Sequence, residues 1–289
     1  MRAFGYARPE SLEEAIGLLE EHGSEATLLA GGTDLMLGLR GGWSKPRIVV
    51  DLKRVRELAS GIEESDAGLT VSAATVMTDI TEDRRMQQRF PALVEAAVVV
   101  GSVQIRNRAT LAGNICNCSP AADTAPPLMV YGAVVIAAGP AGTRRIPVEE
   151  FMVGPGKTAL AAAELVAAIE IPFPPEPYGA AYLRHTRRKG TDLASVTLAC
   201  GVDASGTTRL AYGSMGPRPF LEIDGTGVLA DPKVPDEAKA PLFETIFAKA
   251  SPSPTSMRSG PEYRLAMLRV LGARALRTAI ERLAEGGSK

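Results

Sequence analysis

Two short segments combine glycine with small polar residues in a pattern that suits phosphate binding. Residues 28–35 read Leu-Leu-Ala-Gly-Gly-Thr-Asp-Leu, and residues 110–123 read Thr-Leu-Ala-Gly-Asn-Ile-Cys-Asn-Cys-Ser-Pro-Ala-Ala-Asp. In each segment an apolar, strand-like run breaks into small residues accompanied by Thr, Asn or Asp. Glycine lets the backbone approach a phosphate closely, and backbone N–H groups exposed at such a break form an anion-binding concavity. Because the two segments could hold one diphosphate between them, we predict a cofactor site.

Two further glycine motifs resemble nucleotide-binding patterns but do not fit them. Residues 225–230 match G-x-G-x-x-A, a motif that must open a helix, yet Asp-Pro-Lys-Val-Pro follows at 231–235. Residues 156–158 match the end of a P-loop, which also requires glycine at position 151, where this chain has Phe151. We therefore expect both motifs to be turns.

Cysteine and histidine do not form a recognisable metal or catalytic site. Cys116 and Cys118 are spaced C-x-C without a second pair or a histidine nearby, which favours small residues in a tight loop over metal ligands. With Cys200 there are three cysteines, whereas an iron–sulfur cluster needs about four thiolates. We expect His22 and His185 to be structural. The sequence predicts no catalytic residue and no metal in this chain.

The elements around the first segment predict a small α/β unit. Ser11-Leu-Glu-Glu14 is a capping box, and the apolar residues after it follow helical spacing until Gly23 ends the helix. A strand over residues 26–29 leads into the first segment. A second strand over residues 48–52 closes the unit.

The second segment belongs to a longer stretch that ends in proline. A strand begins at Leu69, a helix covers 91–100 and the segment itself is expected to be a loop. The remaining expected strands, of which the first two form a hairpin, are 133–138, 143–148 and 164–171. Residues 171–178 contain four prolines, which exclude a helix or a central strand, so this stretch is the predicted linker.

Beyond the linker the patterns predict antiparallel strands followed by helices. The expected strands are 180–186, 193–203 and 207–214. One helix is expected over 235–249 and another from Ser259, which forms a second capping box with Glu262. The predicted domains are 1–175, divided into subdomains of about 1–57 and 58–175, and then 178–289.

The composition excludes several classes of protein. Lys+Arg 32 and Asp+Glu 33 give a formal charge of −1, so the chain lacks the basic balance of a nucleic-acid-binding protein. No apolar run approaches the roughly 20 residues that span a bilayer. The first residues include acidic residues and proline where a signal peptide would have an apolar core. We therefore expect a cytoplasmic location.

The two segments together resemble the flavin-binding subunit of the molybdenum hydroxylases. This family includes the medium subunit of carbon monoxide dehydrogenase and the flavin domain of xanthine dehydrogenase. The second segment carries T-x-x-G-N-x-x-x-x-S-P-x-x-D, with Ala112 in place of one glycine of the family's usual Thr-Ile-Gly-Gly-Asn. The resemblance extends along the chain, through residues 4–14, Asp-Leu-Ala at 192–194, Tyr-Arg at 263–264 and Arg-Ala-Leu at 274–276.

The resemblance implies an α+β fold and a set of residues that bind FAD. The fold is a two-subdomain FAD-binding module of the FAD-linked oxidase (vanillyl-alcohol oxidase-like) type, followed by an antiparallel sheet with packed helices. The implied FAD-binding residues are Leu29, Ala30, Gly31, Gly32, Thr33, Asp34, Leu35, Val100, Gly101, Thr110, Gly113, Asn114, Ser119, Asp123, Ile169 and Arg184.

The roles implied for these residues follow their order in the chain. The first segment wraps the diphosphate and ribityl chain, and Thr110, Gly113 and Asn114 hold the opposite side of the diphosphate. Ser119 and Asp123 hydrogen-bond the ribityl or flavin end. Arg184 either stabilises reduced flavin or is a solvated strand residue in the basic run that continues through 187–189.

The resemblance also implies partners. A large subunit would hold the molybdenum–pterin cofactor, a small subunit two [2Fe–2S] clusters, and the assembly would be a dimer of heterotrimers. This chain would pass electrons through FAD to NAD, a quinone or O₂. Two alternatives stay open: a stand-alone FAD-dependent oxidoreductase with its own substrate pocket, and a non-catalytic assembly subunit that has lost FAD.

Overall fold

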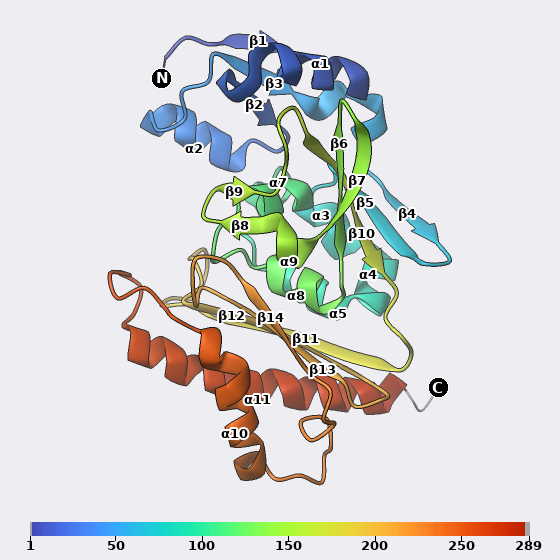
Figure 1. The fold of residues 1–289 in the computed structure, drawn as a ribbon, viewed down its shortest axis with the longest axis vertical. Coiled ribbons are helices and arrows are strands. Elements are labelled where there is room, and N and C mark those ends of the chain that lie inside the picture. The colour runs from blue at the N-terminus through green and yellow to red at the C-terminus, as the bar shows by residue number, and fades with distance from the viewer. Residues whose placement is uncertain (1, 287–289) are drawn as a thin grey trace.

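A small parallel sheet forms the N-terminal end of the molecule (Figure 1). The computed structural model describes residues 2–286, and in it the strands pair in the order β1-β3-β2. Helix α1 joins β1 to β2, and α2 joins β2 to β3. These elements are β1 (Gly5–Ala7), α1 (Leu12–His22), β2 (Ala26–Leu29), α2 (Thr33–Gly41) and β3 (Ile48–Asp51). The α/β unit predicted from the sequence is confirmed.

The first capping box is confirmed in part. The hydroxyl oxygen of Ser11 accepts a hydrogen bond from the backbone N–H of Glu14 at 3.2 Å. The Glu14 carboxylate, however, accepts from the N–H of Glu10 at 2.8 Å. In a full capping box it would accept from the N–H of Ser11 itself. The N-terminus of α1 is nevertheless capped as its local sequence predicts.

A five-stranded antiparallel sheet forms the middle of the molecule, in the order β4-β5-β10-β6-β7. Its strands are β4 (Ile62–Ser65), β5 (Gly68–Ser72), β6 (Val134–Gly139), β7 (Gly142–Pro147) and β10 (Leu165–Pro172). The accompanying helices are α3 (Met77–Glu82), α4 (Arg84–Arg89), α5 (Pro91–Val98), α6 (Val103–Arg106), α7 (Leu111–Cys116), α8 (Ala125–Val130) and α9 (Val148–Phe151). The hairpin predicted from strands 133–138 and 143–148 is confirmed, because β6 and β7 pair with each other. The expected loop at 110–123 is wrong in its first half, because α7 forms there.

A four-stranded antiparallel sheet and two helices form the C-terminal part. The sheet order is β11-β12-β13-β14, from β11 (Tyr178–His185), β12 (Val196–Asp203), β13 (Thr208–Gly213) and β14 (Phe220–Asp224). The helices are α10 (Asp236–Ile246) and α11 (Pro261–Gly286). Strand β14 was not predicted. The second capping box is wrong, because α11 begins at Pro261 and the Ser259 hydroxyl has no hydrogen-bond partner among the described residues.

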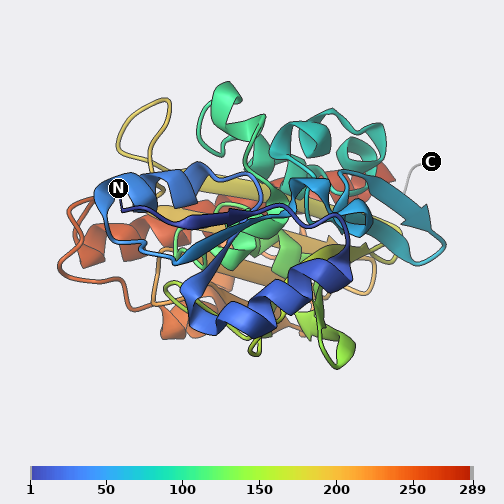
Figure 2. The same ribbon diagram turned by 90° about the horizontal axis from the view of Figure 1, so that it is seen from above.

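The C-terminal sheet is buried on both faces. Alternate residues of β12, such as Leu198 and Cys200, join the apolar cluster under α11, whereas Ala199 belongs to the core of the middle part. Figure 1 shows α11 along one face and the middle helices on the other, and Figure 2 shows the N-terminal layer lying across the top of this stack. Because β12 is buried on both faces, side chains on one of its faces lie between the C-terminal sheet and the middle part.

The two glycine motifs that do not fit nucleotide-binding patterns lie in short segments between the main elements. Of residues 156–158, Gly156 lies in the turn between β8 (Met152–Gly154) and β9 (Lys157–Thr158), and the other two form β9. Residues 225–230 form a bend and turn after β14. The predicted turn is confirmed at 225–230, whereas at 156–158 it is confirmed for Gly156 only, because Lys157 and Thr158 pair as a strand. The chain passes from β10 to β11 within the proline-rich segment, and the predicted domain boundaries stay predictions.

Candidate functional site

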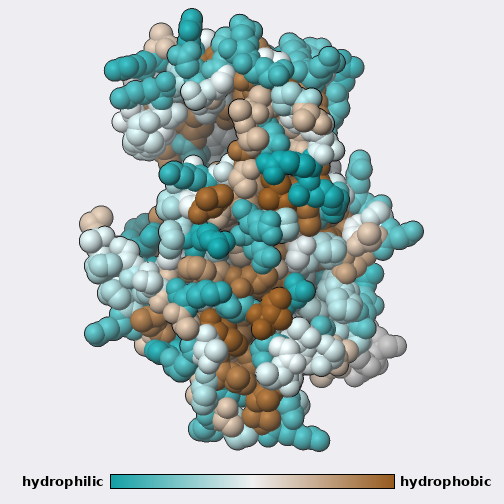
Figure 3. All heavy atoms as spheres, viewed as in Figure 1, coloured by the Kyte–Doolittle hydropathy of each residue, from teal (hydrophilic) through white to brown (hydrophobic). Residues whose placement is uncertain are grey.

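A cleft of about 460 Å³ lies between α2 and α7 and brings the two glycine segments together. The surface is visibly hollowed beneath α2 in the space-filling view (Figure 3). Nine of the sequence-predicted residues line the cleft: Ala30, Gly31, Gly32, Thr33, Asp34, Leu35, Thr110, Gly113 and Asn114. Segments about 80 residues apart in the sequence therefore form two walls of one cavity.

The first wall is the N-terminus of α2. Gly32 is its N-cap and adopts the left-handed conformation with φ of 78°, and no side chain caps this helix end. The first backbone N–H groups of a helix have no partner within the helix, and with the helix dipole they favour an anion. Burial raises the pKa of Asp34 in the first turn.

Gly31 joins the two walls through a backbone contact. A Cβ atom added to Gly31 would lie 2.0 Å from the carbonyl oxygen of Arg108, just before the second segment. The sequence assigned this glycine to close approach of a diphosphate. The structure gives it a second reason, since any side chain at Gly31 would push the two walls apart.

The second wall is the N-terminus of α7. The Thr110 hydroxyl accepts a hydrogen bond from the N–H of Gly113 at 3.0 Å and so caps this short helix. The side-chain oxygen of Asn114 accepts from the Thr124 hydroxyl at 2.7 Å, which leaves the amide hydrogens of Asn114 to donate elsewhere. Ala112 is buried inside α7 at the position where the family usually has glycine.

A second polar cluster joins the segment that ends at Asp123 to strand β11. The Asp123 carboxylate accepts from the Tyr182 hydroxyl at 2.6 Å and from Arg184 Nη1 at 3.2 Å. Burial raises the pKa of Asp123, although the hydrogen bond from Tyr182 and the charge of Arg184 oppose the shift. The side chain of Arg184 is only 14% exposed. The alternative that Arg184 is a solvated strand residue is therefore wrong.

Two buried hydroxyl groups beside this cluster have no partner. Ser195 Oγ and Thr197 Oγ1 make no hydrogen bond with the described residues, and both residues are fully buried. Thr197 pairs with Arg184 across β11 and β12, so their side chains share a face of the sheet. A buried hydroxyl without a partner costs about 1–3 kcal/mol, which a ligand with polar atoms could offset. Sequence reasoning missed these residues, of which Ser195 directly precedes β12 and Thr197 is the second residue of that strand.

Seven of the predicted residues do not line the cleft: Asp123 and Arg184 of the second cluster, and Leu29, Val100, Gly101, Ser119 and Ile169. Ile169 is fully buried in the core of the middle sheet, between β5 and β6, and has no exposed surface for a ligand. Ser119 accepts a hydrogen bond from the N–H of Ala121 at 3.2 Å. The carbonyl oxygen of Gly101 accepts from the Thr191 hydroxyl at 3.3 Å.

Trp43 and Cys116 are two of the cleft-lining residues that sequence reasoning did not assign to the cofactor. Trp43, the only tryptophan of the chain, is 74% exposed there, and its ring lies over Gly38 and Gly41 of α2. Cys116 is the second. Burial and the neighbouring Cys118 raise the pKa of its thiol to about 12, so the thiol is protonated at neutral pH. The sequence offered one signal for Trp43, because the only tryptophan of the chain directly follows the helix at the first glycine segment.

The other expectations concern metals and histidines. Within residues 2–286, no three histidine, cysteine or acidic side chains are grouped so that they could hold a metal ion. No helix in that range has the length and apolar character to cross a membrane. His185 Nε2 lies 3.1 Å from the Tyr263 hydroxyl, a contact between β11 and α11.

Comparison with known proteins places this geometry in a family. Residues 2–174 match the family described as FAD binding domain in molybdopterin dehydrogenase. Residues 181–279 match the CO dehydrogenase flavoprotein C-terminal domain. The chain is 32% identical over 282 residues to the putative xanthine dehydrogenase FAD-binding subunit XdhB of Escherichia coli K12, covering 95% of each. It is 31% identical over 285 residues to the carbon monoxide dehydrogenase medium chain of Hydrogenophaga pseudoflava, covering 97% of this chain and 98% of that chain.

Solved structures agree with this assignment. A carbon monoxide dehydrogenase from Hydrogenophaga pseudoflava that lacks the Mo-pyranopterin moiety matches with a TM-score of 0.89 and 30% identity, covering 98% of this chain and 99% of that chain. Quinoline 2-oxidoreductase from Pseudomonas putida 86 matches with a TM-score of 0.86 and 27% identity, covering 97% and 98%. The chain therefore belongs to the FAD-binding (medium) subunits of the molybdenum hydroxylase family, oxidoreductases whose cofactor is FAD.

Proposed function

We propose that this chain is the electron-transfer subunit of a molybdenum hydroxylase and holds FAD between α2, α7 and strand β11. The observation that carries the proposal is the cleft in which both glycine segments meet. Bound FAD would accept electrons one at a time and deliver them in pairs to an external acceptor. The protein's part is to bind and orient the cofactor and to set the charge around it.

The cleft is suited to the diphosphate. The N-terminus of α2 offers backbone N–H groups, and Thr33 and Asn114 offer side-chain donors from opposite walls. Glycine at position 32 keeps the backbone free of a side chain where the helix begins. Because most of these donors belong to the backbone, recognition here depends on shape more than on charge.

The cluster around Asp123 is suited to the flavin and ribityl end. Arg184 would place a cation near the ring, which favours the reduced, electron-rich cofactor, and Asp123 offsets much of that charge at 3.2 Å. The unpartnered hydroxyls of Ser195 and Thr197 lie on the same side. Ser119, Val100 and Gly101 are assigned to the edge of this region. Ile169 would support the sheet behind the cofactor without touching it.

The partners are inferred from the family. We assign the molybdenum–pterin cofactor to a large subunit and two [2Fe–2S] clusters to a small subunit, in a cytoplasmic dimer of heterotrimers. The relatives include medium chains and FAD subunits of several dehydrogenases, which supports a division of functions among chains. NAD, a quinone or O₂ would take the electrons from this chain.

The sole tryptophan provides a direct test of cofactor binding. FAD absorbs in the range where tryptophan emits, and Trp43 lines the cleft. Adding FAD to the cofactor-free chain should therefore quench its fluorescence saturably, and denaturing the saturated protein should release FAD. Trp43→Phe is the control, since it should remove the fluorescence signal while the protein still turns yellow. A chain that stays colourless and unquenched in excess FAD would overturn the proposal.

A further inference from the structure

Two charged side chains cover the outer edge of strand β11. Because β11 is the first strand of its sheet, the backbone groups on its outer edge have no neighbouring strand within residues 2–286. Glu95 of α5 accepts a hydrogen bond from the backbone N–H of Tyr182 at 2.8 Å. Arg282 of α11 donates to the carbonyl oxygen of Ala180 at 2.5 Å. Residues two apart in a strand direct these groups to the same edge, so the two side chains take the place of a neighbouring strand.

The same two side chains pair with each other. Arg282 Nη2 lies 2.5 Å from Glu95 Oε1, and the two side chains are 32% and 33% exposed. A partly exposed ion pair by itself contributes little stability. Here each partner also makes a hydrogen bond with the backbone of β11, and hydrogen bonds to charged groups are the stronger kind. The pair therefore joins α5, β11 and α11 at one point.

The stretch of β11 held by this pair leads directly into the cluster around Asp123. The Tyr182 hydroxyl donates to the Asp123 carboxylate at 2.6 Å, and Arg184 Nη1 lies 3.2 Å from it. Side chains two residues apart leave a strand on the same face, so one strand position sets both contacts. A shift of β11 by about 1 Å away from Asp123 would take the Arg184 contact beyond hydrogen-bond distance. The cluster therefore depends on where β11 is held.

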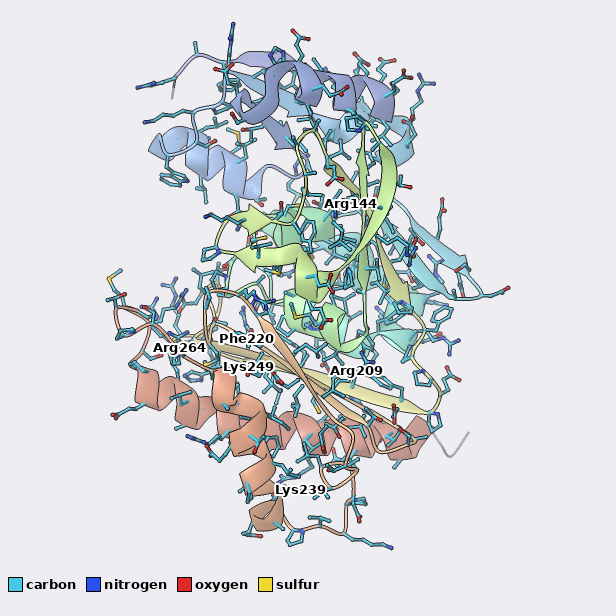
Figure 4. The ribbon with its side chains drawn as sticks, in the orientation of Figure 1. Arg144, Arg209, Phe220, Lys239, Lys249 and Arg264 are labelled. Carbon is cyan, nitrogen blue, oxygen red and sulfur yellow. The ribbon has the colours of Figure 1, made fainter. Side chains whose placement is uncertain are left out.

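Helix α11 is attached to the sheet near both of its ends. Near its start, Arg264 Nε donates to the carbonyl oxygen of Ser195 at 3.0 Å, and Figure 4 shows Arg264 there between the helix and the sheet. Near its end, the attachment is made by Arg282. This second attachment also reaches the middle part of the protein, because Arg282 pairs with Glu95 of α5. The pair therefore fixes β11 relative to both of the parts between which it lies.

We propose that Glu95 and Arg282 are positioning residues of the FAD site, which hold β11 so that Tyr182 and Arg184 reach Asp123. The inference rests on the proposed function, in which the Asp123 cluster binds the flavin and ribityl end of FAD. Neither Glu95 nor Arg282 lines the cleft between α2 and α7. Both act through the backbone of β11, so their loss weakens FAD binding without removing a group that contacts the cofactor.

The test is a double-mutant cycle of the full-length wild type, Glu95→Ala, Tyr182→Phe and the double variant. FAD affinity is measured by the quenching of Trp43, and the unfolding free energy by chemical denaturation of the FAD-free proteins. Glu95→Ala should weaken FAD binding about fivefold in wild type but about twofold or less in Tyr182→Phe, where the positioned hydroxyl is already absent. Its effect on unfolding should likewise be smaller in that background. Glu95→Gln should lose less affinity, because glutamine keeps one acceptor oxygen.

The matched control breaks an ion pair of the same kind elsewhere on α11. Arg269 Nη2 lies 2.8 Å from Glu244 Oε2, and this pair joins α11 to α10. Glu244→Ala should bind FAD like wild type. Its effect on the unfolding free energy should be the same with and without the Tyr182 hydroxyl, because the two sites share no partner.

The outcomes distinguish the positioning role from general stabilisation. Equal effects of Glu95→Ala in the two backgrounds, or an equal loss of FAD affinity in Glu244→Ala, overturn the inference. If wild type binds no FAD, the proposed function fails, and the unfolding cycle decides separately. Coupling between Glu95 and Tyr182 then supports the positioning of the cluster, and additivity overturns it. If Glu95→Ala fails to fold, Glu95→Gln takes its place in the cycle.

Discussion

The two ends of the proposed FAD site are built in different ways. The cleft between α2 and α7 is formed by helix N-termini and glycine, with hydrogen bonds such as that from Gly113 to Thr110 three residues apart. The cluster around Asp123 joins side chains that are 59 and 61 residues apart and carries opposite charges. The first end should therefore be sensitive to any added side-chain volume. The second should be sensitive to the loss of charge.

The largest effect is expected at the charged end, from Asp123→Ala. This change leaves Arg184 largely buried without its carboxylate, which should cost about 3 kcal/mol of unfolding free energy and most of the FAD occupancy. Chemical denaturation and the flavin content after purification measure the two effects. Tyr182→Phe removes a hydroxyl but no charge and should lose much less. Equal losses in the two variants would contradict a charge-dependent cluster.

The next largest effect is expected at the glycine end, from Gly31→Ala. The new methyl group would meet the carbonyl oxygen of Arg108 at 2.0 Å, so the walls must separate, at a cost of about 1–3 kcal/mol. FAD affinity should fall with it. Gly17→Ala is the matched control, because its Cβ meets nothing within 4 Å inside helix α1. That variant should gain about 0.5–1 kcal/mol and bind FAD normally. If both variants changed stability in the same direction, the close contact would not be the cause.

A smaller effect is expected from Thr110→Val, which removes the cap of α7 without changing the side chain's shape. We expect a loss of about 1 kcal/mol and a weaker affinity for FAD, measured by thermal unfolding and by the quenching of Trp43. Thr110→Ser should restore both. Ser11→Ala removes the cap of the distant helix α1 and should lower stability while FAD affinity stays unchanged. Unchanged FAD affinity in Thr110→Val would show that the cap of α7 does not contribute to FAD binding.

The smallest effect is the pH dependence of Asp123→Asn. Burial raises the pKa of Asp123 in the folded protein. An acid whose folded pKa is raised contributes stability below its unfolded pKa and loses that contribution as the pH rises through the folded pKa. Asparagine does not titrate. The unfolding free energy of the FAD-free wild type, relative to the variant, should therefore fall as the pH rises above the unfolded-state pKa of about 4. A constant or rising difference over that range would show that the pairing with Arg184 outweighs burial.

Local sequence patterns predicted elements well where the stabilising contacts are also local. Ser11 caps α1 through an N–H three residues away, as the pattern of the capping box requires. The same pattern at Ser259 failed, because α11 begins at Pro261 and Arg264 is held by the carbonyl oxygen of Ser195, 69 residues away. Strand β14 was likewise missed, since it is defined by its pairing with β13. A local pattern indicates which caps and strands a segment could form. Contacts with residues distant in the sequence decide which of them is formed.

By itself the sequence determined that two glycine segments should face a phosphate-bearing cofactor, and its motifs placed the chain in the FAD-binding family. Glycine and helix-start patterns act through the backbone of their own segment, so they can be recognised without a fold. Only the tertiary structure decided that Asp123 pairs with Tyr182 and Arg184, that Gly31 packs against Arg108 and that Trp43 lines the cleft. These contacts depend on how sheets and helices distant in sequence pack, because burial and charge pairing are set by neighbours in space.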